Sequence, residues 1–114
     1  MVLTEKIVHS AAVVTIVSVD GHLLGGEDIQ HLREKIKSLI ERQINHIILD
    51  LDNLEYMNSL GLGAFLAILV SVKKAKGTLS LINLHDKVRE IFLITKADTI
   101  FNIFASEAEA LAGS

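Results

Sequence analysis

Cysteine and proline are both absent from the 114 residues of this chain. Without cysteine the chain has no disulfide, no thiolate metal ligand and no thiol nucleophile, and this composition suits a reducing compartment. Without proline or a low-complexity segment, nothing marks a linker or an internal boundary. Because half of the residues are apolar, we expect one domain, residues 1–114, built around one core.

Neither a nucleic-acid surface nor a membrane segment is indicated. The 11 basic and 14 acidic residues give a net charge of -3, and the densest basic group is only Lys73, Lys74 and Lys76, so we expect no nucleic-acid partner. The longest mainly apolar stretch, Leu60 to Val72, is shorter than the roughly 20 residues of a membrane-spanning helix. The apolar run Ala11 to Val19 lacks the basic flank of a signal peptide. We therefore expect a cytoplasmic protein without membrane insertion.

Apolar patterns along the chain predict strands that alternate with helices. Strands are predicted by β-branched or continuous apolar runs at Thr4 to Ser10, Ala11 to Val19, His46 to Asp52, Thr78 to Leu84 and Ile100 to Phe104. Helices are predicted by 3.6-residue spacing and end signals at Glu27 to Arg42, at Ser59 to Lys76, from about Asp86, and after Ser106. Asp20-Gly21 reads as a turn, Gly77 as a helix stop, and Ser106 with Glu109 as a capping box.

One strand followed by four β-α units predicts an α/β fold. The four units require a mostly parallel sheet with right-handed crossovers, and the additional N-terminal strand is expected to pair antiparallel beside the first long strand. Function in such sheets gathers beyond the carboxyl ends of the strands. Two turns lie there, Asp20 to Gly26 and Asp52 to Gly63.

The second of these turns ends at a candidate modification site. Asn58 and Ser59 stand where a helix N-cap is preferred, and the unpaired N–H groups and positive dipole of a helix start would tolerate an added phosphate. Ser59 is therefore either a simple cap or a phosphorylation site. Gly61 and Gly63 in the first turn either let the helix pack closely on its strand or let a partner's backbone approach.

The helix that begins at Ser59 is apolar around nearly its whole circumference. Such a helix is either enclosed by the core or covered by a partner, and Leu60 and Leu62 are the best candidates for partner contact. Asp50 and Asp52 are interpreted as caps at a strand end rather than as a catalytic pair. No histidine stands at a metal-ligand spacing, and no dinucleotide fingerprint, phosphate loop or nucleophile elbow is present. We predict no metal, no cofactor and no catalytic residue.

The run Tyr56-Met-Asn-Ser-Leu-Gly-Leu-Gly63, which follows Asp50-Leu-Asp52, resembles the phosphoserine loop of STAS domains, where an aromatic-Met-Asp-Ser-x-Gly-Leu-Gly pattern opens a helix. The order of the elements and the closing run Ile103 to Leu111 are similar to those of bacterial anti-sigma factor antagonists. The resemblance covers essentially the whole chain and implies a STAS-like fold, a binding module rather than an enzyme, and Ser59 as the phosphate acceptor.

The resemblance also implies partners. In that family an anti-sigma factor that is itself a serine kinase, of the histidine-kinase-like ATPase type, phosphorylates the serine, and a metal-dependent serine phosphatase restores it. Partner contacts are predicted around the two turns and the helix start, at Gly21, His22, Asp52, Met57, Asn58, Leu60, Gly61, Leu62 and Gly63.

Two positions depart from the family pattern. Asn58 replaces the acid before the serine, and Leu24 replaces the acid in the usual Gly-x-Leu-Asp of the first turn. Both changes remove negative charge near Ser59. They favour, as an alternative, a STAS scaffold subunit of a lipid-transport or signalling complex that binds without being phosphorylated.

Overall fold

The β-branched segments form the strands of one sheet. In the computed structural model, which describes residues 1–113, the strands are β1 (Val2–His9), β2 (Val13–Leu23), β3 (His46–Asp50), β4 (Leu54–Met57), β5 (Thr78–Ile82) and β6 (Asn102–Phe104). Their order is β1-β2-β3-β5-β6, with β4 paired to the end of β2. β1 is antiparallel to β2 and every other pairing is parallel, which confirms the predicted sheet.

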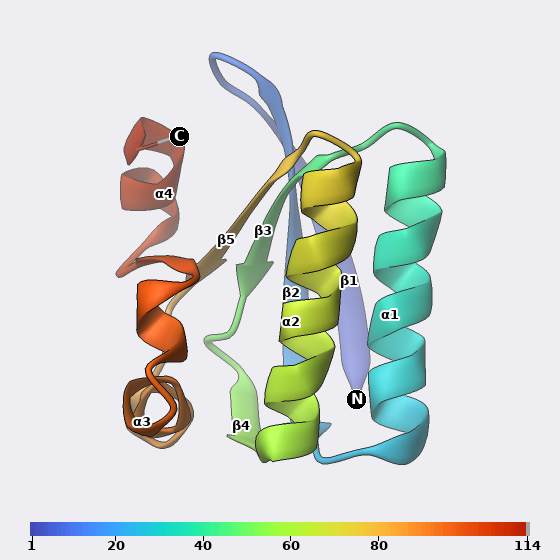
Figure 1. Cartoon of the computed structure of the whole chain (residues 1–114). Coiled ribbons are helices and arrows are strands. Elements are labelled where there is room, and N and C mark those ends of the chain that lie inside the picture. The colour runs from blue at the N-terminus through green and yellow to red at the C-terminus, as the bar shows by residue number, and fades with distance from the viewer. Residues whose placement is uncertain (114) are drawn as a thin grey trace.

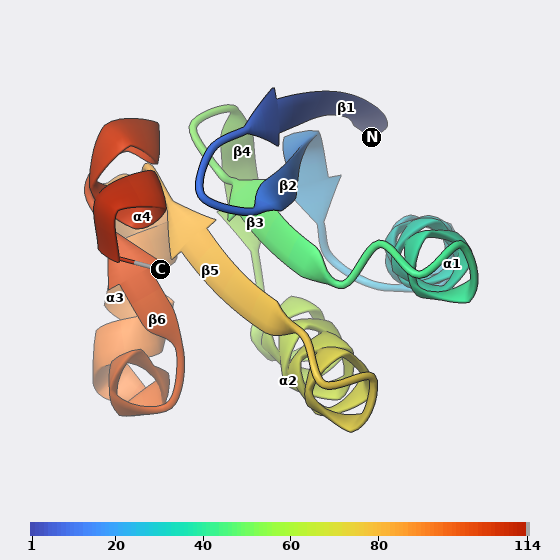
Figure 2. The ribbon, with the colours of Figure 1, turned by 90° about the horizontal axis from the view of Figure 1, so that it is seen from above.

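Four helices complete the four β-α units: α1 (Gly26–Glu41), α2 (Ser59–Lys74), α3 (Asp86–Ile94) and α4 (Glu107–Gly113), with a short 3-10 turn η1 (Ala97–Thr99) after α3. α1 and α2 lie side by side and run in the same direction along one face of the sheet (Figure 1). Seen from above, α4 lies on the other side, next to β5 and β6 (Figure 2). Among residues 1–113 no helix is both long and apolar enough to cross a membrane.

The core has two layers because the sheet buries both faces. The larger layer lies under α1, α2 and α3, where Phe92 stacks on Phe65 at 6.1 Å and meets Phe101 edge-on at 5.5 Å between ring centroids. The smaller layer lies under α4 and consists of Val14, Ile16, Ile48, Ile82 and Ala110. Burial of these side chains is the main force that holds the helices on the sheet.

An ion pair ties the edge strand β1 to α1. Lys35 donates a hydrogen bond to Glu5, and Arg42 lies 3.8 Å from the same carboxylate. The hydrogen bond from Lys35 lowers the pKa of Glu5 below its usual value. Because a lowered folded-state pKa stabilises the fold only above the unfolded pKa, this small contribution is lost as the pH falls through the folded pKa.

Three local predictions about the strands and helix ends were wrong. Asp20-Gly21 is not a turn, because β2 continues to Leu23 through a register shift that Gly21 accommodates with a φ of +112°. The segment predicted as a loop before α2 contains a strand, β4. α2 ends at Lys74, two residues before the predicted Lys76. Lys76 has a positive φ, and Gly77 provides clearance, because a Cβ there would lie 2.0 Å from the Asn45 carbonyl oxygen.

Candidate functional site

The ends of β2 and β4 meet the beginning of α2 at one end of the sheet. Leu23 pairs with Met57 where both parallel strands end, Asn58 follows, and Ser59 is the first residue of α2. The two turns singled out in the sequence are therefore neighbours in space. A backbone hydrogen bond of 3.0 Å from Gly21 N–H to Asn53 O also joins the last part of β2 to the segment after Asp52.

Asn58 connects the two turns through both ends of its amide. Its Oδ1 accepts hydrogen bonds from the N–H groups of Leu60 (3.1 Å) and Gly61 (3.2 Å), which makes it the N-cap of α2. Its Nδ2 donates to the carbonyl oxygen of Leu24 at 2.9 Å. A carboxylate at this position could cap the helix but could not donate to Leu24. The amide is thus the side chain that suits both neighbours.

This double role leads to a graded prediction for two variants. Asn58→Ala loses the cap and the link to Leu24, and we expect the free energy of unfolding to fall by about 2 kcal/mol. Asn58→Asp keeps the cap but places a carboxylate oxygen against the carbonyl oxygen of Leu24. We expect the free energy of unfolding to fall by about 1 kcal/mol. Urea titrations measure both losses, and an Asn58→Asp protein as stable as the parent chain would show that the contact with Leu24 contributes nothing.

Ser59 presents its hydroxyl on the surface. The residue is exposed, and within residues 1–113 its hydroxyl oxygen has no hydrogen-bond partner. The expectation of several unpaired N–H groups around it was wrong, because Asn58 Oδ1 accepts from Leu60 and Gly61 and Asn58 O accepts from Leu62 N at 3.1 Å. A phosphate on Ser59 would therefore feel the helix dipole but would extend into solvent rather than into a ready-made ring of donors.

The two glycines of the first turn have different roles. A Cβ on Gly61 would lie 2.6 Å from the Leu23 carbonyl oxygen, whereas a Cβ on Gly63 would meet nothing within 4 Å. Gly61 therefore allows α2 to pack against the end of β2. Gly63 is exposed and leaves bare helix backbone one turn after Ser59.

The two leucines proposed as partner contacts differ in their exposure to solvent. Leu60 is 61% exposed and Leu62 only 6%. Leu62 belongs to the core, as does Met57, so neither side chain is available for the surface contact that was predicted. Leu24 is 44% exposed, and Leu60 Cδ1 lies 3.4 Å from the position of a Cβ on the neighbouring Gly25. The accessible apolar surface next to Ser59 therefore consists of Leu60 and Leu24.

A polar cluster borders this surface on the side of β4. His22 Nε2 lies 3.2 Å from Glu55 Oε2, and the His22 ring meets the Tyr56 ring edge-on at 5.2 Å. Lys87 of α3 places Nζ 4.6 Å from the Tyr56 ring centroid and donates to its hydroxyl at 3.3 Å. Of these residues only His22 was predicted from the sequence. The others were missed because their grouping depends on the pairing of β4 with β2.

Asp50, the last residue of β3, has a structural role. Asp50 Oδ1 accepts hydrogen bonds from Asp52 N (3.1 Å) and from Asn83 Nδ2 (3.0 Å), as expected of a cap at a strand end. Asp52 itself is exposed in the turn that leads to β4. In the described part of the chain no group of three or more histidine, aspartate and glutamate side chains could hold a metal ion.

The model of the STAS domain family matches residues 5–110, nearly the whole chain. The chain belongs to the STAS domain family. Its sequence is 38% identical over 74 residues to the anti-sigma-B factor antagonist of Bacillus subtilis, a match that spans 65% of this chain and 67% of that protein. This STAS domain is thus a member of the anti-sigma factor antagonists.

Solved structures agree with the fold of this STAS domain. The crystal structure of TM1081 from Thermotoga maritima, a candidate anti-sigma factor antagonist, is similar with a TM-score of 0.87 and 25% identity over 97% of this chain and 92% of that one. The antagonist SpoIIAA is similar in fold in its unphosphorylated and phosphorylated forms, with TM-scores of 0.72 and 0.71 at 21% identity, over 97% of this chain in both cases and 96% and 97% of those chains.

Proposed function

We propose that this STAS domain binds a kinase-type anti-sigma factor in a partner-switching pathway and is switched off by phosphorylation of Ser59. The unphosphorylated domain occupies the anti-sigma factor, of the histidine-kinase-like ATPase type, and so frees the sigma factor. The kinase activity of that partner then modifies Ser59, and a metal-dependent serine phosphatase reverses the modification. In this scheme the domain works in the cytoplasm as a binding module and not as an enzyme.

The observation that carries this proposal is the exposed hydroxyl of Ser59 at the edge of an accessible apolar surface. Leu60 and Leu24 give a partner apolar area to bury, and the bare backbone at Gly63 permits close approach. A partner that covers these residues must also cover Ser59, because Ser59 and Leu60 are consecutive in the first turn of α2. One residue can therefore control the whole contact.

The physical basis of the switch is desolvation. A phosphoserine carries about -1.5 to -2 charges at neutral pH, and an interface that covers it must remove that charge from water. If desolvation and repulsion raise the free energy of the complex by about 3 kcal/mol, affinity falls more than about a hundredfold. The monomer loses little, because its phosphate would remain in solvent at the positive end of the helix dipole.

Phosphate transfer to Ser59 tests the proposal directly. The domain is incubated with its cognate anti-sigma kinase and ATP, and the modified residue is mapped by mass spectrometry. We expect one phosphate per chain in the parent protein and in Ser10→Ala, which changes an exposed serine of the β1–β2 connection, and none in Ser59→Ala. A phosphate found only at other residues would contradict the proposed mechanism.

The scaffold-subunit alternative is favoured by Asn58 and Leu24, which leave the surroundings of Ser59 without the acids of the family pattern. It predicts a stable complex with a partner that is not a kinase. Leu60→Glu would disrupt the complex in both schemes. Ser59→Ala would leave a scaffold complex intact. In the switching scheme the same variant would prevent ATP from releasing the kinase complex. The effect of ATP on the parent complex therefore separates the two functions.

A further inference from the structure

An open groove runs between α1 and α2, outside the Ser59 site. It has a volume of about 650 Å³, and Ile36, Ile40, Ala67 and Ile68 form its apolar floor. Ile36 and Ile68 are buried, while Ile40 and Ala67 are partly exposed. Apolar side chains of a docking segment could therefore reach the floor from solvent.

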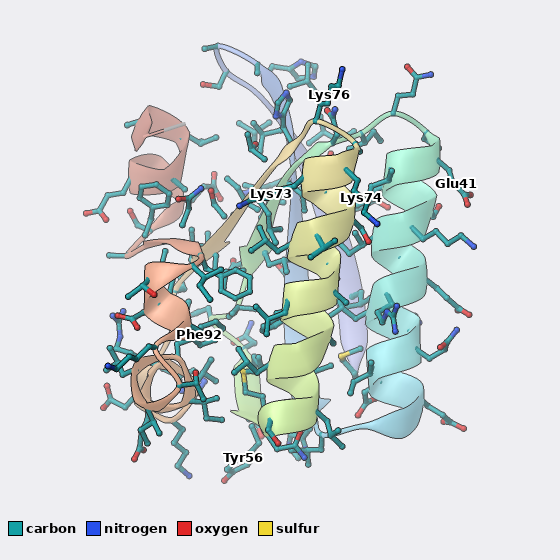
Figure 3. All side chains as sticks on the ribbon, in the orientation of Figure 1. Glu41, Tyr56, Lys73, Lys74, Lys76 and Phe92 are labelled. Atoms are coloured by element: carbon teal, nitrogen blue, oxygen red, sulfur yellow. The ribbon has the colours of Figure 1, made fainter. Side chains whose placement is uncertain are left out.

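The groove has a basic end in a chain of net negative charge. Arg33, Lys37 and Lys74 line it together with Glu34 and Glu41. Lys76 lies at the same end as Lys74, whereas Lys73 points away from α1 on the other side of α2 (Figure 3). Glu34 accepts a hydrogen bond from Gln30, and Glu41 lies 4.0 Å from Lys37. Within residues 1–113 the salt bridges include none of Arg33, Lys73, Lys74 and Lys76. Arg33, Lys74 and Lys76 are therefore available to an acidic partner in the groove, although the whole chain carries -3.

The direction of the helices determines how a third helix would lie in the groove. α1 and α2 both run from the Ser59 end toward the lysine end (Figure 1). A helix that lies antiparallel to both has its N-terminus at the lysines, so that acidic residues of its first turn meet the cations. The positive end of its helix dipole then lies beside the negative ends of the α1 and α2 dipoles, which is favourable. Its apolar stripe would face Ile40 and Ala67, as in other complexes in which a helix occupies a groove.

We infer that the groove between α1 and α2 is a docking surface for an amphipathic helix of a protein partner, with acidic residues in its first turn and an antiparallel orientation. From Lys74 to Leu60 the α2 axis advances about 21 Å, so a helix of about 14 residues would extend from the lysines to Leu60. A docked helix of this length would therefore reach the exposed Leu60 at the other end of α2. The inference rests on the groove and its charges and is independent of phosphorylation.

Two designed peptides test this inference. Both are stapled 14-residue helices with the same leucine stripe; one has three glutamates in the first turn and its twin has three lysines there. Fluorescence anisotropy against the unphosphorylated domain is expected to show at least about tenfold tighter binding of the acidic peptide, since three charge pairs change sign. Amide NMR signals of Ala67, Ser71 and Lys74 are expected to shift.

Surface variants of the domain show whether the peptides bind in the groove, and a control variant on another surface shows that a lost affinity is not caused by unfolding. Lys74→Glu, an exposed change, is expected to abolish or reverse the preference for the acidic peptide, and Ala67→Glu to weaken both peptides. Leu93→Glu, which changes an exposed leucine of α3, is the control and should bind as the parent does. Equal affinity for the two peptides, no binding, or NMR shifts confined to other surfaces would overturn the inference. None of these results depends on whether a kinase modifies Ser59.

Discussion

Ser59→Asp is expected to weaken binding of the anti-sigma factor by at least about tenfold. The aspartate carries one charge rather than the nearly two of a phosphate, so about half of a 3 kcal/mol penalty, roughly 1.5 kcal/mol, is expected, and about 1.4 kcal/mol corresponds to tenfold in affinity. The charge lies beside Leu60 in the first turn of α2, where docking would remove it from water. Titration calorimetry with the purified partner measures the change.

Two controls separate charge from shape in this experiment. Ser59→Ala removes the hydroxyl without adding charge, and we expect its affinity to stay within about twofold of the parent, because the Ser59 hydroxyl has no partner within residues 1–113. Ser10→Asp adds the same charge in the β1–β2 connection and should also bind normally. Equal affinities for the Ser59→Asp and Ser59→Ala proteins would remove the electrostatic step from the mechanism.

Gly61→Ala is expected to lower the free energy of unfolding by about 1 to 2 kcal/mol. Its new methyl group would lie 2.6 Å from the carbonyl oxygen of Leu23, which belongs to backbone that cannot move without disturbing the pairing of β2 with β4. Forcing an extra carbon into a packed site typically costs about 1 to 3 kcal/mol. Better helix propensity returns only about 1 kcal/mol. Chemical denaturation measures the net loss.

Gly63→Ala is the matched control two residues away. Because a Cβ on Gly63 meets nothing within 4 Å, this variant gains helix propensity without a clash, and we expect it to be more stable than the parent by about 1 kcal/mol. Under the proposed function the same methyl group would hinder a closely approaching partner, so a more stable domain should bind less tightly. If the two glycine variants changed stability in the same direction, the packing role assigned to Gly61 would be wrong.

The alternation of strands and helices was predictable because it depends on local patterns. The β-branched run of β2, the continuous apolar run of β3 and the 3.6-residue spacing of α1 each identify their element without knowledge of the rest of the chain. The position of Ser59 at the start of α2 was likewise predictable, because a capping residue precedes it directly.

The finer features of the site depend on contacts between distant segments. β4 has only four residues and forms because the bulge at Gly21 lets the end of β2 turn toward it. The different roles of Gly61 and Gly63 follow from one carbonyl group at Leu23, 38 positions earlier than Gly61. The sequence also did not predict that Leu62 is buried and Leu60 exposed. A helix that is apolar all round has no single apolar stripe that identifies its buried face.

The most direct test compares the domain before and after complete phosphorylation of Ser59 by its kinase, with the same partner preparation. Binding to the anti-sigma factor should fall more than about a hundredfold, while the urea midpoint of the isolated domain should stay essentially unchanged, because the phosphate extends into solvent. Undiminished binding, or a fold that loosens on phosphorylation, would contradict the account.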